Sequence, residues 1–433
     1  MIKVSVIMPV YNVEEYLEEA LLSVMKQTLH EIEIICVNDG STDGSLDILN
    51  KYANMDARIR VISKENSGYG HTMNVGIDAA QGEYIGVVET DDYVDANMFE
   101  TLYEEAVSKQ LDMLKAGYRE FTKDKNGDNV FVHIPILPEK VKDLYGTVAG
   151  WQEDLRVFES GVVTWSGIYK RAFLNQYQIR HNETPGASYQ DNGFGFQVLM
   201  YAGRVSFMDT AFYNLRRDNP NSSVHSKKKV FCMCDEYDFI RGKILEANHP
   251  KEKELLGICF ARRLGNYEWS LRRIAPEYRP MFYERMRKDF ADALELGECQ
   301  SAFLTRSRWN YVYTVLQDDN IATMELSDMK EHVRERILQA EKIYIYGAGM
   351  WGKKVYQKLE RNLWKDKIAG FLVTNKLNET DALFDIPVMQ LDESRLEKTD
   401  LIIAAVGDRF LGEVLTTLTN KGCTNYIIKN DLF

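Results

Sequence analysis

Short apolar runs that alternate with amphipathic segments are the sequence feature that most restricts the fold of this chain. Four runs near the N-terminus are typical of buried strands: Val4–Val10, Ile32–Val37, Ile59–Ile62 and Tyr84–Val88. The segments between them have helical spacing: Glu14–Gln27, Ser45–Asn54 and Asn74–Ala80. Strands that alternate with helices favour an α/β fold with a mainly parallel sheet, in which the loops after the strands form the ligand site.

The length of 433 residues predicts two or three domains. The α/β pattern covers residues 1–228. Residues 229–335 are rich in helix formers and read as a helical connector, with helices at Phe239–Leu245, Leu255–Trp269 and Arg285–Leu296 and no assigned chemistry. Residues 336–433 return to an α/β pattern and predict a small doubly wound domain. Its expected strands and helices are Lys342–Tyr346, Lys353–Glu360, Ile368–Val373, Leu401–Val406, Glu413–Leu418 and Tyr426–Ile428.

Charge and cysteine usage restrict the partners and the compartment. The net charge of −12 argues against a nucleic-acid partner, which usually requires a basic surface. The six cysteines are scattered and favour reduced thiols in a cytoplasmic protein. The apolar start of the chain is short and reaches Pro9 at once, so we expect a strand and not a signal peptide. No stretch approaches about 18 apolar residues, although a peripheral position at the inner face of the cell membrane stays open.

Glu89-Thr90-Asp91-Asp92, at the end of a predicted strand, places three carboxylates within four positions. Such like charges are costly without a cation, and carboxylate oxygens suit Mg²⁺ or Mn²⁺. The alternative is a solvated acidic turn that caps a helix starting near Ala96. The cluster alone does not decide between the two.

Three other polar segments have a ligand-binding and a structural interpretation. Asp39, after the second strand, can bind a nucleobase or ribose, or cap the helix after Ser45; taken alone, the cap is favoured. The glycine-containing loop Asn66–His71, which leads to Asn74, can let a ligand approach the backbone or be a plain loop. Asp191, before a helix expected near Gly193, can be a general base or a helix cap, and again the cap is favoured alone.

Together these segments have the order and spacing of a known family. The matching strings are Val6-Ile-Met-Pro-Val-Tyr-Asn12, Val37-Asn-Asp-Gly-Ser-Thr-Asp43, Asn66-Ser-Gly68 with Asn74, Glu89-Thr-Asp-Asp92 and Gln190-Asp191. Over about residues 1–226 the chain resembles the inverting family 2 glycosyltransferases, which have the GT-A fold. The resemblance implies transfer of a sugar from a nucleotide-diphosphate donor, UDP-sugar being expected, to a hydroxyl of a glycan or lipid-linked saccharide. Polysaccharide, capsule or cell-wall glycan synthesis is the expected process.

The resemblance also implies roles for individual residues. Those expected to bind the nucleotide-sugar are Pro9, Tyr11, Glu14, Asp39, Asn66, Asn74 and Glu89. Asp91 would ligate Mn²⁺ or Mg²⁺, with Asp92 and His225 at the same metal site. Asp191 matches the catalytic base, and Trp165 lies in the segment that borders the acceptor.

Two residues depart from the family pattern. Glu89 stands where an Asp is usual, and Gln190 stands where an acidic residue is common. They are the support for an alternative in which the chain is a non-catalytic scaffold with a degenerate transferase domain and a nucleotide-binding module. A nucleotidyltransferase fits less well, because Pro9-Val-Tyr-Asn12 is not the glycine-rich basic loop that such an enzyme needs.

The last region contains Gly347-Ala-Gly349-Met-Trp-Gly352 between a strand and a helix, which is the context of a dinucleotide-binding loop. The region resembles small Rossmann-like domains of bacterial sugar-modifying enzymes. The acidic residue expected about 20 positions further on is missing, so NAD is not expected. A structural or homo-oligomerisation module, a nucleotide-binding module and an oxidoreductase stay open, in that order of preference.

Overall fold

The computed structural model describes the chain except residues 124–126, 221–228, 318–328, 362–363, 375–381 and 430–433. The chain divides into two compact units, Met1–Leu255 (unit 1) and Leu256–Phe433 (unit 2). Helix α7 (Cys232–Glu246), which the sequence analysis placed in the connector, belongs to unit 1. The division into three domains stays a prediction.

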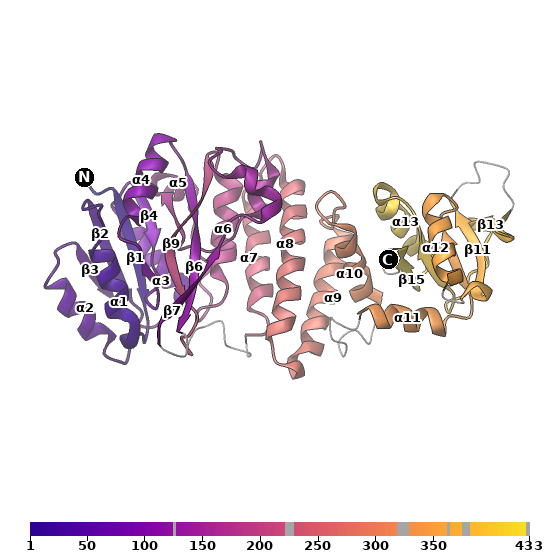
Figure 1. Cartoon of the computed structure of the whole chain (residues 1–433), viewed down its shortest axis with the longest axis horizontal. Coiled ribbons are helices and arrows are strands. Elements are labelled where there is room, and N and C mark those ends of the chain that lie inside the picture. The colour runs from indigo at the N-terminus through magenta and orange to yellow at the C-terminus, as the bar shows by residue number, and fades with distance from the viewer. Residues whose placement is uncertain (124–126, 221–228, 318–328, 362–363, 375–381, 430–433) are drawn as a thin grey trace. The chain divides into compact units, whose positions relative to one another are not determined.

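Unit 1 is built on a mixed sheet (Figure 1). Its strands follow the order β3-β2-β1-β4-β8-β6-β9-β5, with β7 paired to β6. Its strands are β1 (Val4–Val10), β2 (Ile32–Asn38), β3 (Ile59–Ser63), β4 (Tyr84–Val87), β5 (Tyr93–Val94), β6 (Met113–Lys123), β7 (Asn129–Ile134), β8 (Gly167–Lys170) and β9 (Val205–Arg216). The first four strands are parallel, as predicted, whereas β8 runs antiparallel to both β4 and β6. The sheet is therefore more mixed than the alternation of strands and helices indicates.

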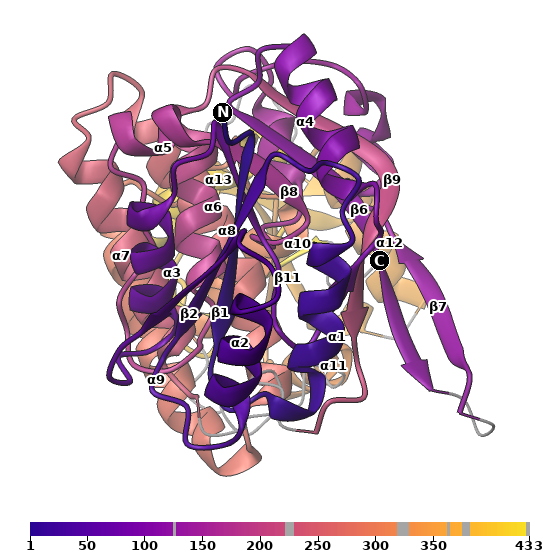
Figure 2. The same ribbon diagram turned by 90° about the vertical axis from the view of Figure 1, so that its left-hand side faces the viewer.

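Helices cover both faces of the parallel part of this sheet. The helices of unit 1 are α1 (Glu14–Met25), α2 (Ser45–Ala53), α3 (Tyr69–Ala79), α4 (Met98–Ser108), α5 (Arg171–Gln176), α6 (Gln190–Tyr201) and α7, with short 3-10 helices at Glu139–Leu144 and Leu155–Glu159. Alternate residues of β1 point to opposite faces. Val6 packs in one core with Leu17 and Leu21 of α1, whereas Ile7 on the other face meets Gly76 of α3. Figure 2 shows β1 and β2 between α3 and the α1–α2 pair.

Unit 2 combines helices with a second sheet. The helices are α8 (Glu252–Arg273), which begins in unit 1, α9 (Arg279–Glu295), α10 (Arg306–Gln317), α11 (Met329–Gln339), α12 (Met350–Arg361) and α13 (Asp408–Asn420). The strands are β10 (Ile343–Tyr346), β11 (Ile368–Val373), β12 (Ala382–Leu383), β13 (Ile386–Gln390), β14 (Leu401–Ala404) and β15 (Tyr426–Ile428). They are ordered β12-β13-β11-β10-β14-β15, with β12 antiparallel to β13 and the other pairs parallel.

Among the residues that the structure describes, no helix combines the length and the hydrophobicity that a membrane crossing requires.

Candidate active site

The carboxyl ends of β1, β2 and β4 lie at one edge of the unit 1 sheet. Val10 is the register partner of Asn38, and Ile7 is that of Val87, so the segments that follow these strands are neighbours. Thr90, in the acidic cluster after β4, donates its hydroxyl to Pro9 O at 2.8 Å. Tyr11 is half exposed next to them. This edge is where a parallel sheet usually places its ligand.

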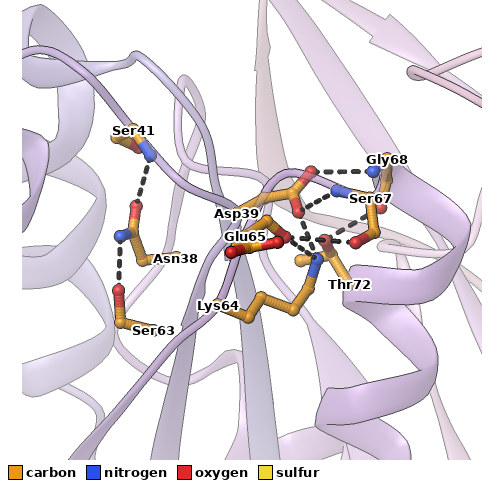
Figure 3. A network of polar contacts seen from close by, with 9 residues as sticks. All are labelled: Asn38, Asp39, Ser41, Ser63, Lys64, Glu65, Ser67, Gly68 and Thr72. Carbon is orange, nitrogen blue, oxygen red and sulfur yellow. Dashed lines mark hydrogen bonds and ion pairs between the residues drawn. The ribbon is translucent and has the colours of Figure 1, made fainter.

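Asp39 is a buried anchor between two loops (Figure 3). Its carboxylate accepts hydrogen bonds from the amides of Ser67 (2.8 Å) and Gly68 (3.0 Å). It also forms an ion pair with Lys64. Three donors around one carboxylate fix the start of α3 against the end of β2.

Asp39 does not cap α2, so that interpretation is wrong. The N-terminus of α2 is held by other carboxylates, since Ser45 N donates to Asp43 Oδ1 (3.0 Å) and Gly44 N donates to Glu14 Oε2 (2.6 Å). Glu14, expected on the ribose side, therefore has a structural partner at this turn.

The loop before α3 is packed against a distant segment. A Cβ on Gly68 (φ +89°) would lie 2.8 Å from Gly186 N, and one on Gly70 would lie 1.9 Å from Asn182 O. The glycines thus admit the backbone of residues 182–186, and α3 begins at Tyr69, five positions before the predicted start at Asn74. Asn66, between Lys64 and this loop, is exposed.

Asn74 binds the same segment with its whole amide group. Its Nδ2 donates to His181 O (3.0 Å) and Glu183 Oε1 (2.9 Å), and its Oδ1 accepts from His181 N (2.8 Å). Its expected contact with the nucleotide-sugar stays a prediction, and its observed role is to hold the segment that leads to Asp191.

The acidic cluster is not a solvated helix cap. The N-cap of α4 is Asn97, and Asp92 is 2% exposed. Asp92 accepts hydrogen bonds from the Tyr213 hydroxyl and from Arg216 N, both at 2.7 Å. Burial, and then the charge of Asp91, raise the pKa of Asp92 well above its usual range. Both oxygens of Asp92 thus bind β9, and its expected part at a metal site stays a prediction.

Glu89 and Asp91 have more open surroundings than Asp92. Glu89 Oε1 accepts from the Tyr69 hydroxyl at 2.6 Å, and Asp91 Oδ2 accepts from Asn219 Nδ2 at 2.9 Å. Burial raises the pKa of Glu89 to about 8, and the charges of Asp91 and Asp191 add to this rise. Carboxylates whose negative charges disfavour one another are the donor set that a hard divalent cation relieves.

The carboxylates of Glu89 and Asp91 therefore suit a divalent cation by their charge and by their oxygen donors. Within the described ranges, no group of three or more His, Cys, Asp or Glu residues has the arrangement of a metal site. His225, also predicted at the metal, lies outside the described residues.

Asp191 lies in the first turn of α6. The N-cap is Tyr189, in the left-handed region at φ +70°, so the interpretation of Asp191 as the cap is wrong. Burial raises the pKa of Asp191 to about 6, while hydrogen bonds from Asn192 and the charge of Lys115 oppose the rise. A carboxylate of this kind is ionised at neutral pH and is still basic enough to accept a proton.

Gln190 has a structural reason to be an amide. It donates from Nε2 to Thr184 Oγ1 (2.9 Å) and Gly186 O (3.1 Å), and accepts from Ser188 N (2.5 Å). An acidic residue has no donor for the first two bonds unless it is protonated. This departure from the family pattern is thus compensated in the loop itself.

Two buried charged residues near Asp191 were missed by the sequence analysis. Lys115 in β6 is 2% exposed, donates to Val163 O and to the Tyr169 hydroxyl (3.2 Å), and has its pKa lowered by burial to about 7. Glu236 in α7 is 1% exposed and accepts from Gly193 N (2.8 Å) and Asn182 Nδ2 (3.0 Å). Its pKa is raised by burial to about 8.

The available signals for these residues were weak. Lys115 stands inside an apolar strand, which is unusual for a lysine, and Glu236 carries no motif.

The predicted acceptor residue Trp165 precedes β8 and stacks on Tyr213 with ring centroids 4.2 Å apart. It therefore contacts the residue that binds Asp92.

Known proteins match the region that contains this site. The family described as glycosyl transferase family 2 matches residues 5–150. The uncharacterized glycosyltransferase EpsJ of Bacillus subtilis is 37% identical over 226 residues, which are 51% of this chain and 62% of EpsJ. The glycosyltransferase GlyG of Streptococcus pneumoniae is 30% identical over 221 residues, 49% of this chain and 70% of GlyG. The chain belongs to glycosyl transferase family 2.

Solved structures agree with the fold of this family 2 chain. The structure of S. aureus TarS 1-349 aligns with a TM-score of 0.56 and 22% identity, over 74% of this chain and 89% of TarS 1-349. Structures of that protein in complex with UDP and with UDP-GlcNAc align with the same TM-score. The expected α/β glycosyltransferase fold is confirmed. The chain spans less than two thirds of the length of EpsJ.

Proposed function

We propose that this family 2 chain is an inverting glycosyltransferase that moves a sugar from a UDP-sugar to a hydroxyl group of a glycan or glycolipid. The observation that supports the proposal best is that Asp191 and Glu89 lie close together, although they are about a hundred residues apart in sequence. The two carboxylates lie close enough for the charge of Asp191 to raise the pKa of Glu89, and the charges of both raise the pKa of Tyr69. The TarS complexes support UDP as the nucleotide of the donor.

In the proposed mechanism, Asp191 accepts the proton of the acceptor hydroxyl. The oxygen then attacks the anomeric carbon from the side opposite the diphosphate, the bond to the diphosphate breaks, and the single displacement inverts the configuration. A pKa of about 6 leaves Asp191 mainly ionised at pH 7. Asp91 would hold Mn²⁺ or Mg²⁺, whose charge stabilises the leaving diphosphate.

The donor half of the site would be organised by Asp39. Its carboxylate is already bonded to Ser67 N, Gly68 N and Lys64. Asp39 would therefore keep two loops in place beside the nucleotide, in addition to the contact with the base that the family resemblance implies. The process would be the synthesis of a polysaccharide, capsule or cell-wall glycan. A cytoplasmic location, association with the inner membrane face and a homo-oligomer stay predictions.

The test is release of the nucleotide from a panel of UDP-sugars, with and without Mn²⁺ and with oligosaccharide acceptors. We expect metal-dependent release that Asp191→Asn and Asp91→Asn each reduce by a factor of about 100 or more. Asp47→Asn, on the outer part of α2, is the matched control and should keep wild-type turnover. Absence of release with every common donor would favour the non-catalytic scaffold. Wild-type turnover of Asp191→Asn would exclude Asp191 as the base.

A further inference from the structure

The glycine loop of unit 2, Gly347–Gly352, is tightly packed at both ends and open at Gly349 between them. Gly347 has φ +115°, and a Cβ there would lie 2.7 Å from Ala405 O. A Cβ on Gly352 would lie 1.8 Å from Gly347 O. At Gly349, by contrast, a Cβ would have no atom within 4 Å, and the residue is exposed. Packing explains Gly347 and Gly352 but not Gly349.

The loop Gly347–Gly352 follows β10, the strand at which the order of strand addition in the sheet reverses. β10 lies between β11 and β14, and the chain adds strands on the β11 side before it crosses to β14. The loops after β10 and β14 therefore separate at their carboxyl ends, which is the usual position of a ligand crevice in such sheets. The first helical hydrogen bond of α12 runs from Lys353 N to Gly349 O (3.1 Å), so the preceding amides are outside the helical ladder.

Three cationic side chains surround Trp351 in the first turn of α12. The Lys429 ammonium lies 3.1 Å from the ring centroid, that of Lys354 4.7 Å, and the Arg306 guanidinium 5.8 Å. Arg306 also donates to Val406 O (3.4 Å), in the loop after β14. Positive charge thus gathers at the positive end of the α12 dipole, where cations are unfavourable unless an anion is present.

Lys429 is the residue that requires an explanation. It is 0% exposed, and its Nζ has no hydrogen-bond acceptor among the described residues. The Trp351 ring offers a cation–π contact but no lone pair for the three N–H groups. A buried ammonium with unused donors is costly unless an anion completes the site.

We infer that Lys429, the α12 N-terminus and the loop around Gly349 form an anion site in unit 2 that takes the phosphate group of a phosphorylated ligand. The site is separate from the proposed donor site, because it lies outside unit 1 and uses side-chain cations rather than carboxylates and a metal. The position after β11 has Thr374, whose hydroxyl bonds Tyr346 OH at 2.6 Å, in place of the carboxylate that a ribose diol would prefer. The recognised group is therefore the phosphate, and NAD is not favoured over other phosphates.

The test is titration calorimetry on the full chain in EDTA, with inorganic phosphate, ADP, UDP and NAD as separate ligands. EDTA removes the divalent cation that the proposed donor site needs, so heat from that site is suppressed. We expect saturable binding of at least one phosphate ligand, weakened about tenfold or more by Lys429→Met, because one charged donor is lost. Lys353→Met, an exposed lysine of the same helix, is the matched control and should bind as wild type does.

Two further measurements make the result decisive. Gly349→Val should also lose binding, because its side chain would enter the open space without touching the core. Lys429→Met should melt no lower than wild type without ligand, since it removes an unpaired buried charge. Tighter binding of ADP or UDP than of phosphate would identify a nucleotide, and equal binding would identify the phosphate group alone. No binding of any of the four ligands, or equal binding by Lys429→Met, would overturn the inference.

Discussion

The electrostatic coupling of Lys115 to Asp191 leads to a prediction about the pH dependence of turnover. Lys115 is buried in β6, and its charge lowers the pKa of Asp191 against the effect of burial. Lys115→Met keeps most of the side-chain volume and removes the charge. The pKa of Asp191 should therefore rise, and a higher pH should be needed to ionise the base.

The magnitude follows from the pKa of about 6 for Asp191. With the carboxylate as the active form, about nine-tenths of wild-type molecules carry an ionised base at pH 7 and about one-tenth at pH 5, so turnover should fall about tenfold between them. Each unit by which Lys115→Met raises the pKa reduces turnover at pH 5 by a further factor of about 10. Lys115 itself has a pKa of about 7, so its effect fades above neutral pH, and the two proteins should differ least there.

The assay is nucleotide release at saturating donor from pH 4.5 to 8.5, with each protein normalised to its own plateau. Lys51→Met, an exposed lysine of α2 paired with Glu18, is the control and should keep the wild-type profile. A lysine that only supports Val163 and Tyr169 would change the height of the plateau but not the midpoint of the acid limb. The same midpoint in wild type and Lys115→Met would refute the reasoning.

Three other predictions follow from buried contacts and are checked by urea denaturation with circular dichroism. Asp92→Ala should lower the free energy of unfolding by about 3 kcal/mol, because it removes the acceptor for the Tyr213 hydroxyl proton and for Arg216 N; a loss below about 1 kcal/mol would contradict this. Gly70→Ala should cost about 3 kcal/mol or more, since the new Cβ would overlap Asn182 O; a fold as stable as wild type would show that this backbone contact can relax. In EDTA, stability should fall more steeply between about pH 5 and 8 in wild type than in Glu89→Gln, because the folded state binds more protons at Glu89, whose pKa is raised to about 8. The same pH dependence in both proteins would contradict the raised pKa of Glu89.

The first four strands of unit 1 and the strands β10, β11, β14 and β15 of unit 2 were predictable because each is a short apolar run. Every residue of β1 and β2 is buried, and both strands were expected within one residue of their observed ends. The strand β11 was predicted with its observed bounds, Ile368–Val373. None of the strands β5–β9 was predicted, and the antiparallel strand β8 is one of them. Its pairing with β4 and β6 depends on contacts between segments far apart in sequence, which no periodicity reports.

The positions of Asp39 and Asp91 after strands, and of Asp191 near the start of a helix, were readable, but their partners were not. Taken alone, Asp39 looked like a helix cap because an Asp on a turn before a helix commonly is one. In the structure its oxygens instead accept hydrogen bonds from the amides of Ser67 and Gly68, which are 28 and 29 positions away. The alternative interpretation was wrong because two other carboxylates, Asp43 and Glu14, already hold the helix.

The surroundings of Asp191 illustrate why a motif cannot report the charge state of its own residue. Burial raises its pKa, Lys115 opposes that rise, and Glu236 fixes the turn through Gly193 N. Lys115 and Glu236 are 76 and 45 positions from Asp191 and belong to no shared pattern in one sequence. A motif can therefore identify the carboxylate that reacts, whereas the pH range in which it is ionised depends on residues that only the folded chain brings to it. The comparison of Lys115→Met with Lys51→Met tests that dependence directly, because both remove one lysine charge and only one of them lies beside the base.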